Sequence, residues 1–150
     1  MAEIKQSDVL LKLSLPLSIA IGKTKKRKFI LNLNQFRNLH YRSLNNAKQN
    51  YSDLVGGLLA NERSRIPYDT KVMAIYIYYA PTKRLVDVAN PCSVIDKFTC
   101  DGIVKRGILV DDNITHLREV RYVWGGVDRD NPRCDLFLVK HTPGDYSCLV

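Results

Sequence analysis

The sequence predicts a single α+β domain in which two helices pack on one mixed sheet of about five strands, in the order β-β-α-β-α-β-β. Three patterns indicate this class: an alternating apolar stretch near the start, a long amphipathic segment after it, and a continuous apolar segment in the middle of the chain. The 150 residues suffice for one domain with its own core, so we assign residues 1–150 to one domain. Residues 141–150 are expected to form a tail.

Apolar residues alternate with others from Leu11 to Ile21, a period of two that is typical of a β-strand. Pro16 lacks the N–H that a ladder needs, so we expect an edge strand or a bulge there. A turn at Gly22 and a returning strand at 29–31 predict a β-hairpin. A cationic tip of this kind is more often merely solvated, and it indicates phosphate binding only if the rest of the chain implies a nucleic acid. Its cations are Lys23, Lys25, Lys26, Arg27 and Lys28.

Apolar residues then recur every three or four positions from Phe36 to Leu58, which predicts one long helix lying against a sheet. Asn34 is expected to cap its first turn. His40 falls on the apolar stripe, where a core role is favoured over a catalytic one. Residues 71–79 are apolar on both faces and predict a central strand covered on both sides.

A second helix is predicted to start at Asn90, as the cap, with Pro91 at the first helical position. Gly107 is expected to end it. Alternation over 119–124 predicts another strand, followed by a turn-rich connection over 125–132. Residues 136–139 are expected to form the closing strand.

The charge balance favours a polyanionic partner. The chain has 23 basic and 15 acidic residues, a net charge of +8, and basic side chains gain affinity by releasing counterions from phosphates. Charge alone is equally compatible with a soluble basic domain that binds no polyanion. None of the four cysteines lies in a C-x-x-C pair, so we expect free, mostly buried thiols in a reducing compartment. With no secretory signal or membrane span expected, we predict an intracellular, cytoplasmic protein without a membrane partner.

The segment 84–113 gathers five of the 15 acidic residues. Taken singly, each aspartate is better explained as a turn former, a helix cap or, for Asp101, an ion-pair partner of Lys97. Taken together in a basic chain, they predict a site for a hard divalent cation such as Mg²⁺, which prefers oxygen ligands. The five are Asp87, Asp96, Asp101, Asp111 and Asp112.

Such ions could activate water and stabilise the leaving oxygen of a phosphodiester, with Lys97 neutralising developing charge. Lys83, Arg84 and the hairpin cations would hold the DNA backbone without reading bases. A helix over 91–106 is about 24 Å long, which places Asp87 and Asp112 near opposite ends. A shorter helix, or a symmetric dimer in which each site is shared between two chains, would bring them together.

At these residues the chain resembles the RusA family of Holliday-junction resolvases, which are common in phages and prophages. The family pattern is Asp-x-Asp-Asn, then a helical Lys with a downstream Asp, then Asp-Asp shortly after a Gly. Asp87 and Asn90 match the first motif, Lys97 and Asp101 the second, and Asp111-Asp112 the third. The match covers about residues 83–123. Ala89 stands where the second aspartate of the first motif is expected, and the spacing from Asn90 to Lys97 is about one helical turn longer.

The resemblance implies a small homodimeric endonuclease that nicks four-way DNA junctions with Mg²⁺ or Mn²⁺ and no small-molecule cofactor. It makes Asp87 and Asp112 metal ligands and Lys97 a catalytic or phosphate-contacting residue, with Asp111 beside them and Asp96 as the candidate to replace the carboxylate missing at Ala89. Asn90 and Asp101 would support the site. A second reading is a non-catalytic nucleic-acid-binding module with a degenerate site, and a third is a nuclease for other branched or single-stranded DNA.

Overall fold

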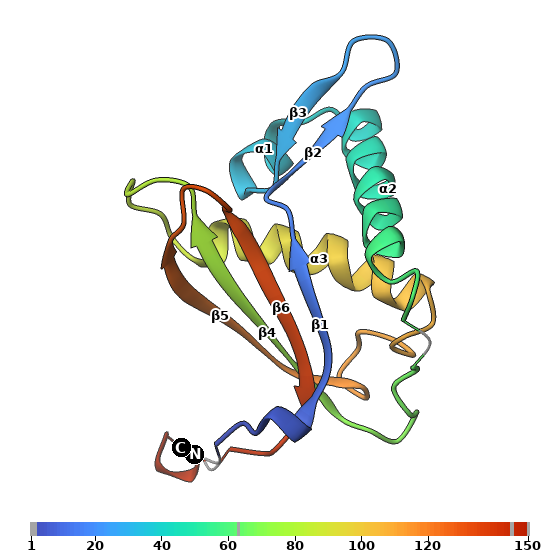
Figure 1. Cartoon of the computed structure of the whole chain (residues 1–150), viewed down its shortest axis with the longest axis vertical. Coiled ribbons are helices and arrows are strands. Elements are labelled where there is room, and N and C mark those ends of the chain that lie inside the picture. Colours follow the sequence, from blue (N-terminus) through green and yellow to red (C-terminus); the bar gives the residue numbers. More distant parts are fainter. Residues whose placement is uncertain (1–2, 63, 145, 150) are drawn as a thin grey trace.

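A four-stranded mixed sheet forms one side of the molecule (Figure 1). Its strands lie in the order β1 (Val9–Leu15), β6 (Arg133–Lys140), β4 (Val72–Ala80) and β5 (Leu117–Val127). β6 pairs antiparallel with β1 and β4, whereas β4 and β5 are parallel. This computed structural model describes residues 3–62, 64–144 and 146–149, and it confirms the predicted α+β class.

The alternating stretch predicted as one strand is divided between two sheets. β1 stops at Leu15, and β2 (Ser18–Ile21) pairs with β3 (Arg27–Ile30) in a separate hairpin that stands away from the main sheet (Figure 1). The break falls at Pro16, which has no N–H to donate. Gly22 makes the hairpin turn with φ +97°, where a Cβ would come within 2.5 Å of the Lys25 carbonyl oxygen. The hairpin is therefore confirmed, and β1 is an edge strand as expected.

The segment predicted as one long helix forms two. Asn32, rather than Asn34, caps α1 (Leu33–Asn38) by accepting a hydrogen bond from the Gln35 N–H at 2.8 Å. The backbone is extended at Leu39 and His40, and α2 (Tyr41–Leu58) starts anew. The core role predicted for His40 is wrong, because its exposed ring caps α2 by accepting from the Arg42 N–H.

α3 (Ala89–Lys105) crosses one face of the sheet, and α2 packs on the side of α3 that faces away from the sheet (Figure 1). Phe98 of α3 meets three rings, Phe29 of β3, Phe36 of α1 and Tyr51 of α2, at centroid distances of 6.0, 6.2 and 6.0 Å. Gly107 has φ +73°, so the predicted glycine stop is confirmed. The helix nevertheless starts two residues earlier than predicted, at Ala89, with Val88 in the capping position.

β5 is longer than predicted, because residues 125–127 continue it against the end of β4 across a bulge at Tyr78/Tyr79. Short 3₁₀ turns lie at Gln6–Asp8 and Ser147–Leu149. Cys92, Cys100 and Cys134 are buried free thiols, as expected, and Cys148 is exposed. Within the described ranges, no helix combines the length and apolar character needed to cross a membrane.

Two glycines test the contact between α2 and α3. A Cβ on Gly102 would lie 3.1 Å from the Val55 Cβ and Cγ1, inside a packed core, whereas a Cβ on the exposed Gly57 would meet nothing within 4 Å. We expect Gly102→Ala to destabilise the protein by about 1 kcal/mol, because overpacking outweighs the gain in helix propensity. Gly57→Ala should stabilise it by about 0.5–1 kcal/mol. Urea unfolding measures both, and a gain for Gly102→Ala would contradict close helix packing.

Candidate nucleic-acid interface

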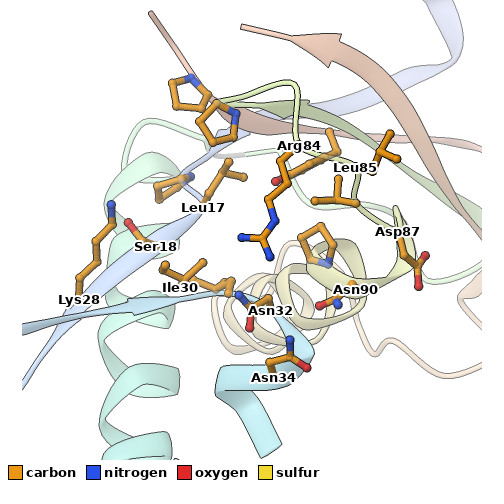
Figure 2. Close-up of a pocket in the computed structure, with 17 residues that line it drawn as sticks. Leu17, Ser18, Lys28, Ile30, Asn32, Asn34, Arg84, Leu85, Asp87 and Asn90 are labelled. Atoms are coloured by element: carbon orange, nitrogen blue, oxygen red, sulfur yellow. The ribbon is translucent and has the colours of Figure 1, made fainter. Parts of the chain in front are cut away.

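A cleft of about 570 Å³ opens between the β2–β3 hairpin and the loop that joins β4 to α3 (Figure 2). Arg84 of the loop reaches into it, and Lys28 of β3 stands at its other side (Figure 2). Asp87 and Asn90, at the start of α3, line the same cleft. Residues that the sequence assigned to backbone binding and to the first acidic motif are therefore brought together from segments more than 50 positions apart.

The other predicted DNA-binding cations lie outside the lining of this cleft. Lys23, Lys25 and Lys26 occupy the exposed hairpin turn, Arg27 is the first residue of β3, and Lys83 lines an adjoining hollow of about 360 Å³. α2 holds the hairpin through side chains, since Asn46 accepts from the Gly22 N–H at 3.1 Å and Asn50 donates to the Ala20 carbonyl at 2.9 Å. Arg27 donates to the Ser43 hydroxyl at 2.9 Å. None of the seven predicted cations is ion-paired with another described residue.

The capping role predicted for Asn90 is wrong, because Val88 holds the capping position and the side-chain acceptor comes from Asp87 just before it. The Asp87 carboxylate accepts from the Ala89 N–H at 3.0 Å, which satisfies a donor in the first turn of α3. Asn90 instead accepts from the Leu33 N–H at 2.9 Å and so ties α1 to α3. Asp87 is otherwise exposed, and its second oxygen has no hydrogen-bond partner among the described residues. This hydrogen bond fixes the position of the Asp87 carboxylate and leaves its second oxygen available to a ligand.

Asp96 faces the sheet. Tyr76 of β4 donates to its Oδ1 at 2.7 Å and Tyr122 of β5 to its Oδ2 at 2.8 Å, while the Cys100 thiol lies 3.2 Å from Oδ1. Burial, with the thiol and carboxylate nearby, raises the pKa of Tyr76 well above its ordinary value, so it stays a donor. Sequence reasoning assigned these tyrosines only to strands. Tyr76 and Tyr122 lie opposite each other because β4 pairs with β5, and both face α3. Local sequence patterns do not reveal which strands pair.

The carboxylates after α3 form a second group. Asp111 accepts from the Asp112 N–H at 2.8 Å and from the Asn113 amide at 2.9 Å, which holds the turn. Partial desolvation first, then the neighbouring Asp111 and Asp101, raises the pKa of Asp112. Burial first, then the Asp96 carboxylate, raises the pKa of the Cys100 thiol, and Asp112 makes a smaller contribution. Sites that crowd carboxylates in this way favour a bound cation.

Lys97 does not form the ion pair predicted with Asp101. Its Nζ lies 5.4 Å from the centre of the Phe36 ring, a cation–π contact with α1, and no described acid lies within ion-pair distance. Both Lys97 and Asp101 are exposed on α3. The ammonium group therefore keeps all its donors available to a ligand.

The two acidic groups remain apart within one chain. From Ala89 to Asp101, α3 rises about 18 Å, and this length separates Asp87 from the Asp101–Asp112 group. Among the described residues, no three His, Cys, Asp or Glu side chains lie close enough together to hold a metal ion. The start and the end of α3 therefore carry two separate groups of carboxylates in the described part of one chain.

Comparison with known proteins adds no relative: no protein-family model matches the sequence, and no curated protein matches it. The geometry of the chain itself must therefore support any functional assignment.

The raised pKa of Asp112 predicts a stability effect with a definite sign. The folded state binds this proton more tightly than the unfolded state, whose carboxyl titrates near 3.8, so ionising Asp112 costs stability as pH rises through that value and above it. Asp112→Asn should therefore increase the free energy of unfolding at pH 7, which raises the midpoint temperature. The gain should be less than about 1 kcal/mol because the site is largely exposed, and it should vanish below about pH 3.5. Thermal unfolding at both pH values measures this.

Asp69→Asn is the control, because Asp69 is an exposed carboxylate in the connection before β4. It should show no comparable gain at pH 7. A fall in the midpoint of Asp112→Asn at pH 7 would mean that the Asp112 carboxylate is held by favourable contacts and is not crowded.

Proposed function

We propose that this chain is an endonuclease that hydrolyses phosphodiester bonds in branched DNA, such as four-way junctions, with Mg²⁺ or Mn²⁺. The observation that carries the proposal is the cleft in which Arg84 and Lys28, both without ion-pair partners among the described residues, lie with Asp87. Cations without internal partners are available to phosphates. A carboxylate that lines the same cleft supports hydrolysis as the reaction.

The acidic motifs match those of the resolvase family in order, which supports hydrolysis as the activity. Their separation along α3 supports a homodimer in which Asp87 of one chain meets Asp112 of the other. A two-fold axis across α3 would turn the start of one helix toward the end of the other, because the two copies would then run antiparallel. The metal ion would be held between chains, and one chain alone would be inactive.

A second candidate is a nucleic-acid-binding module that has lost catalysis. Asp96, the candidate replacement for the carboxylate missing at Ala89, already accepts a tyrosine hydroxyl on each oxygen. A carboxylate engaged in this way can serve as a structural acceptor beneath the sheet-facing side of α3. The binding surface of this candidate is the same cleft and hairpin.

Cleavage of a synthetic four-way junction separates the two candidates. We expect nicking with Mg²⁺ or Mn²⁺ that disappears with a chelator, and a loss of at least about a hundredfold in Asp87→Asn and Asp112→Asn, the scale on which charge-stabilising groups contribute. Asp69→Asn, remote in sequence from both motifs, should cut normally. Tight junction binding without cleavage under either metal would favour the binding module.

Mixing the two inactive variants tests the shared site. In a mixed dimer of Asp87→Asn and Asp112→Asn chains, one of two shared sites is intact, so random mixing should restore about a quarter of wild-type nicking sites. A site contained within each chain predicts no recovery. Single nicks should be scored, because paired cuts need both sites of a dimer.

The hairpin cations should govern the salt dependence of binding. Replacing Lys23, Lys25 and Lys26 by Gln should reduce the slope of log affinity against log salt by about 2–3 units if each contacts a phosphate. As a control, replace three exposed cations away from the hairpin, Lys5, Arg118 and Lys140. Equal slopes for the hairpin variant and the wild type would show that the turn is merely solvated.

A further inference from the structure

The walls of the cleft are apolar although cations stand at its sides. Leu85 is 96% exposed and Ile30 41% exposed, which is unusual for large aliphatic side chains facing a concave surface. Figure 2 shows Arg84 reaching between Leu17 and Ile30 on the hairpin side and Leu85 on the loop side. A flat apolar group inserted beside the guanidinium would cover these aliphatic side chains and remove them from water.

Fixed hydrogen-bond donors lie in the same cleft. The amide oxygens of Asn32 and Asn90 accept backbone N–H groups at 2.8 and 2.9 Å, and this sets the orientation of each amide. Each Nδ2 is left as a donor without a partner among the described residues. Of the described residues that line the cleft, Asp87 alone is acidic, and Lys28 and Arg84 are basic.

A ligand that matches this lining has a flat apolar face, hydrogen-bond acceptors on its edge and a negative charge. A nucleotide combines all three, since its base stacks on guanidinium planes and its phosphate pairs with cations. The volume of about 570 Å³ is that of pockets that hold ligands of nucleotide size. A base within a duplex cannot enter such a cleft until it leaves the stack.

We infer that the cleft binds one unstacked nucleotide of a DNA strand, with its base between Arg84 and the aliphatic walls and its phosphate near Lys28. The inference rests on the proposed function and narrows its substrate: branched DNA that presents an unpaired nucleotide at the branch point is bound more tightly than a fully paired four-way junction. The base is accepted for its flat face, so the preference is largely independent of sequence.

The test compares two synthetic four-way junctions, one fully paired and one with a single unpaired 2-aminopurine nucleotide at the branch, in chelator so that neither is cut. The wild type should bind the second about tenfold more tightly, the scale of one stacked base, and the emission of 2-aminopurine should change on binding. Equal affinity for both junctions would overturn the inference. Tighter binding of an all-RNA copy would overturn the assignment to DNA.

Two variants locate the effect in the cleft. Leu85→Ser should abolish the preference for the unpaired nucleotide by weakening binding of that junction more than binding of the paired one, because Leu85 is 96% exposed and carries no charge. Arg84→Gln should weaken binding of both junctions and also remove the preference. Leu149→Ser, which changes a leucine that is 78% exposed outside the cleft, should behave as the wild type. A preference that survives Leu85→Ser would place the nucleotide elsewhere.

Cleavage of the paired junction in Mg²⁺, measured separately, distinguishes this inference from the proposed function. Nicking without a preference for the unpaired nucleotide rejects the nucleotide cleft and keeps the nuclease. A preference without nicking keeps the cleft and favours the binding module. If the protein binds neither junction, both proposals fail.

Discussion

The burial of α3 on two sides is the constraint on which the rest of the structure depends. One side of this helix covers the sheet, and on the other Phe98 is enclosed by rings from β3, α1 and α2. Aromatic contacts of this kind add to the large apolar area that each ring buries. They fix the hairpin relative to the start of α3, although the hairpin pairs with no strand of the main sheet. The contact between Phe29 and Phe98 holds the hairpin against α3, and the cleft opens beside it, between the hairpin and the loop before α3.

The same burial determines where polar groups can stand. Along α3 the exposed side chains form a narrow stripe, Ala89, Lys97, Asp101 and Lys105, at steps of four or eight residues. Asp96 falls beside this stripe and turns toward the sheet, where two tyrosines satisfy it. A buried or half-buried carboxylate needs such donors to offset desolvation. The carboxylates left open to a ligand are consequently Asp101 on the exposed stripe and those before the first turn of α3 and after its last.

Local chemistry made several features predictable from the sequence. Gly107 ends a helix because its φ of +73° suits glycine, and the apolar segment predicted over 71–79 is a central strand, β4. The predicted cover on both faces is wrong, because alternate residues of β4 from Ile75 to Tyr79 are only half-buried. Pairing partners were not predictable. Leu11 to Ile21 has one alternating pattern, yet its two halves belong to different sheets, and nothing local distinguishes them beyond Pro16. For the site, Arg84 and Asp87 were found by type and spacing, but Tyr76, Tyr122 and the apolar cleft arise only when distant segments meet.

The net charge of +8 fits either a polyanionic partner or a merely soluble basic domain, and the positions of the ion pairs help to distinguish the two. The ion pairs between described residues join Arg121, Arg133 and His141 to acids of β5, β6 and the turn between them, on the sheet. The hairpin and the loop before α3 carry cations without such partners. Such cations raise the encounter rate with a polyanion, because no acid in the described ranges neutralises them in an ion pair. Exposed cations without ion pairs among the described residues also lie elsewhere, Lys5, Arg118 and Lys140 among them. The excess of +8 is therefore spread over the chain, and what distinguishes the cleft is that Lys28 and Arg84 line it together with apolar side chains.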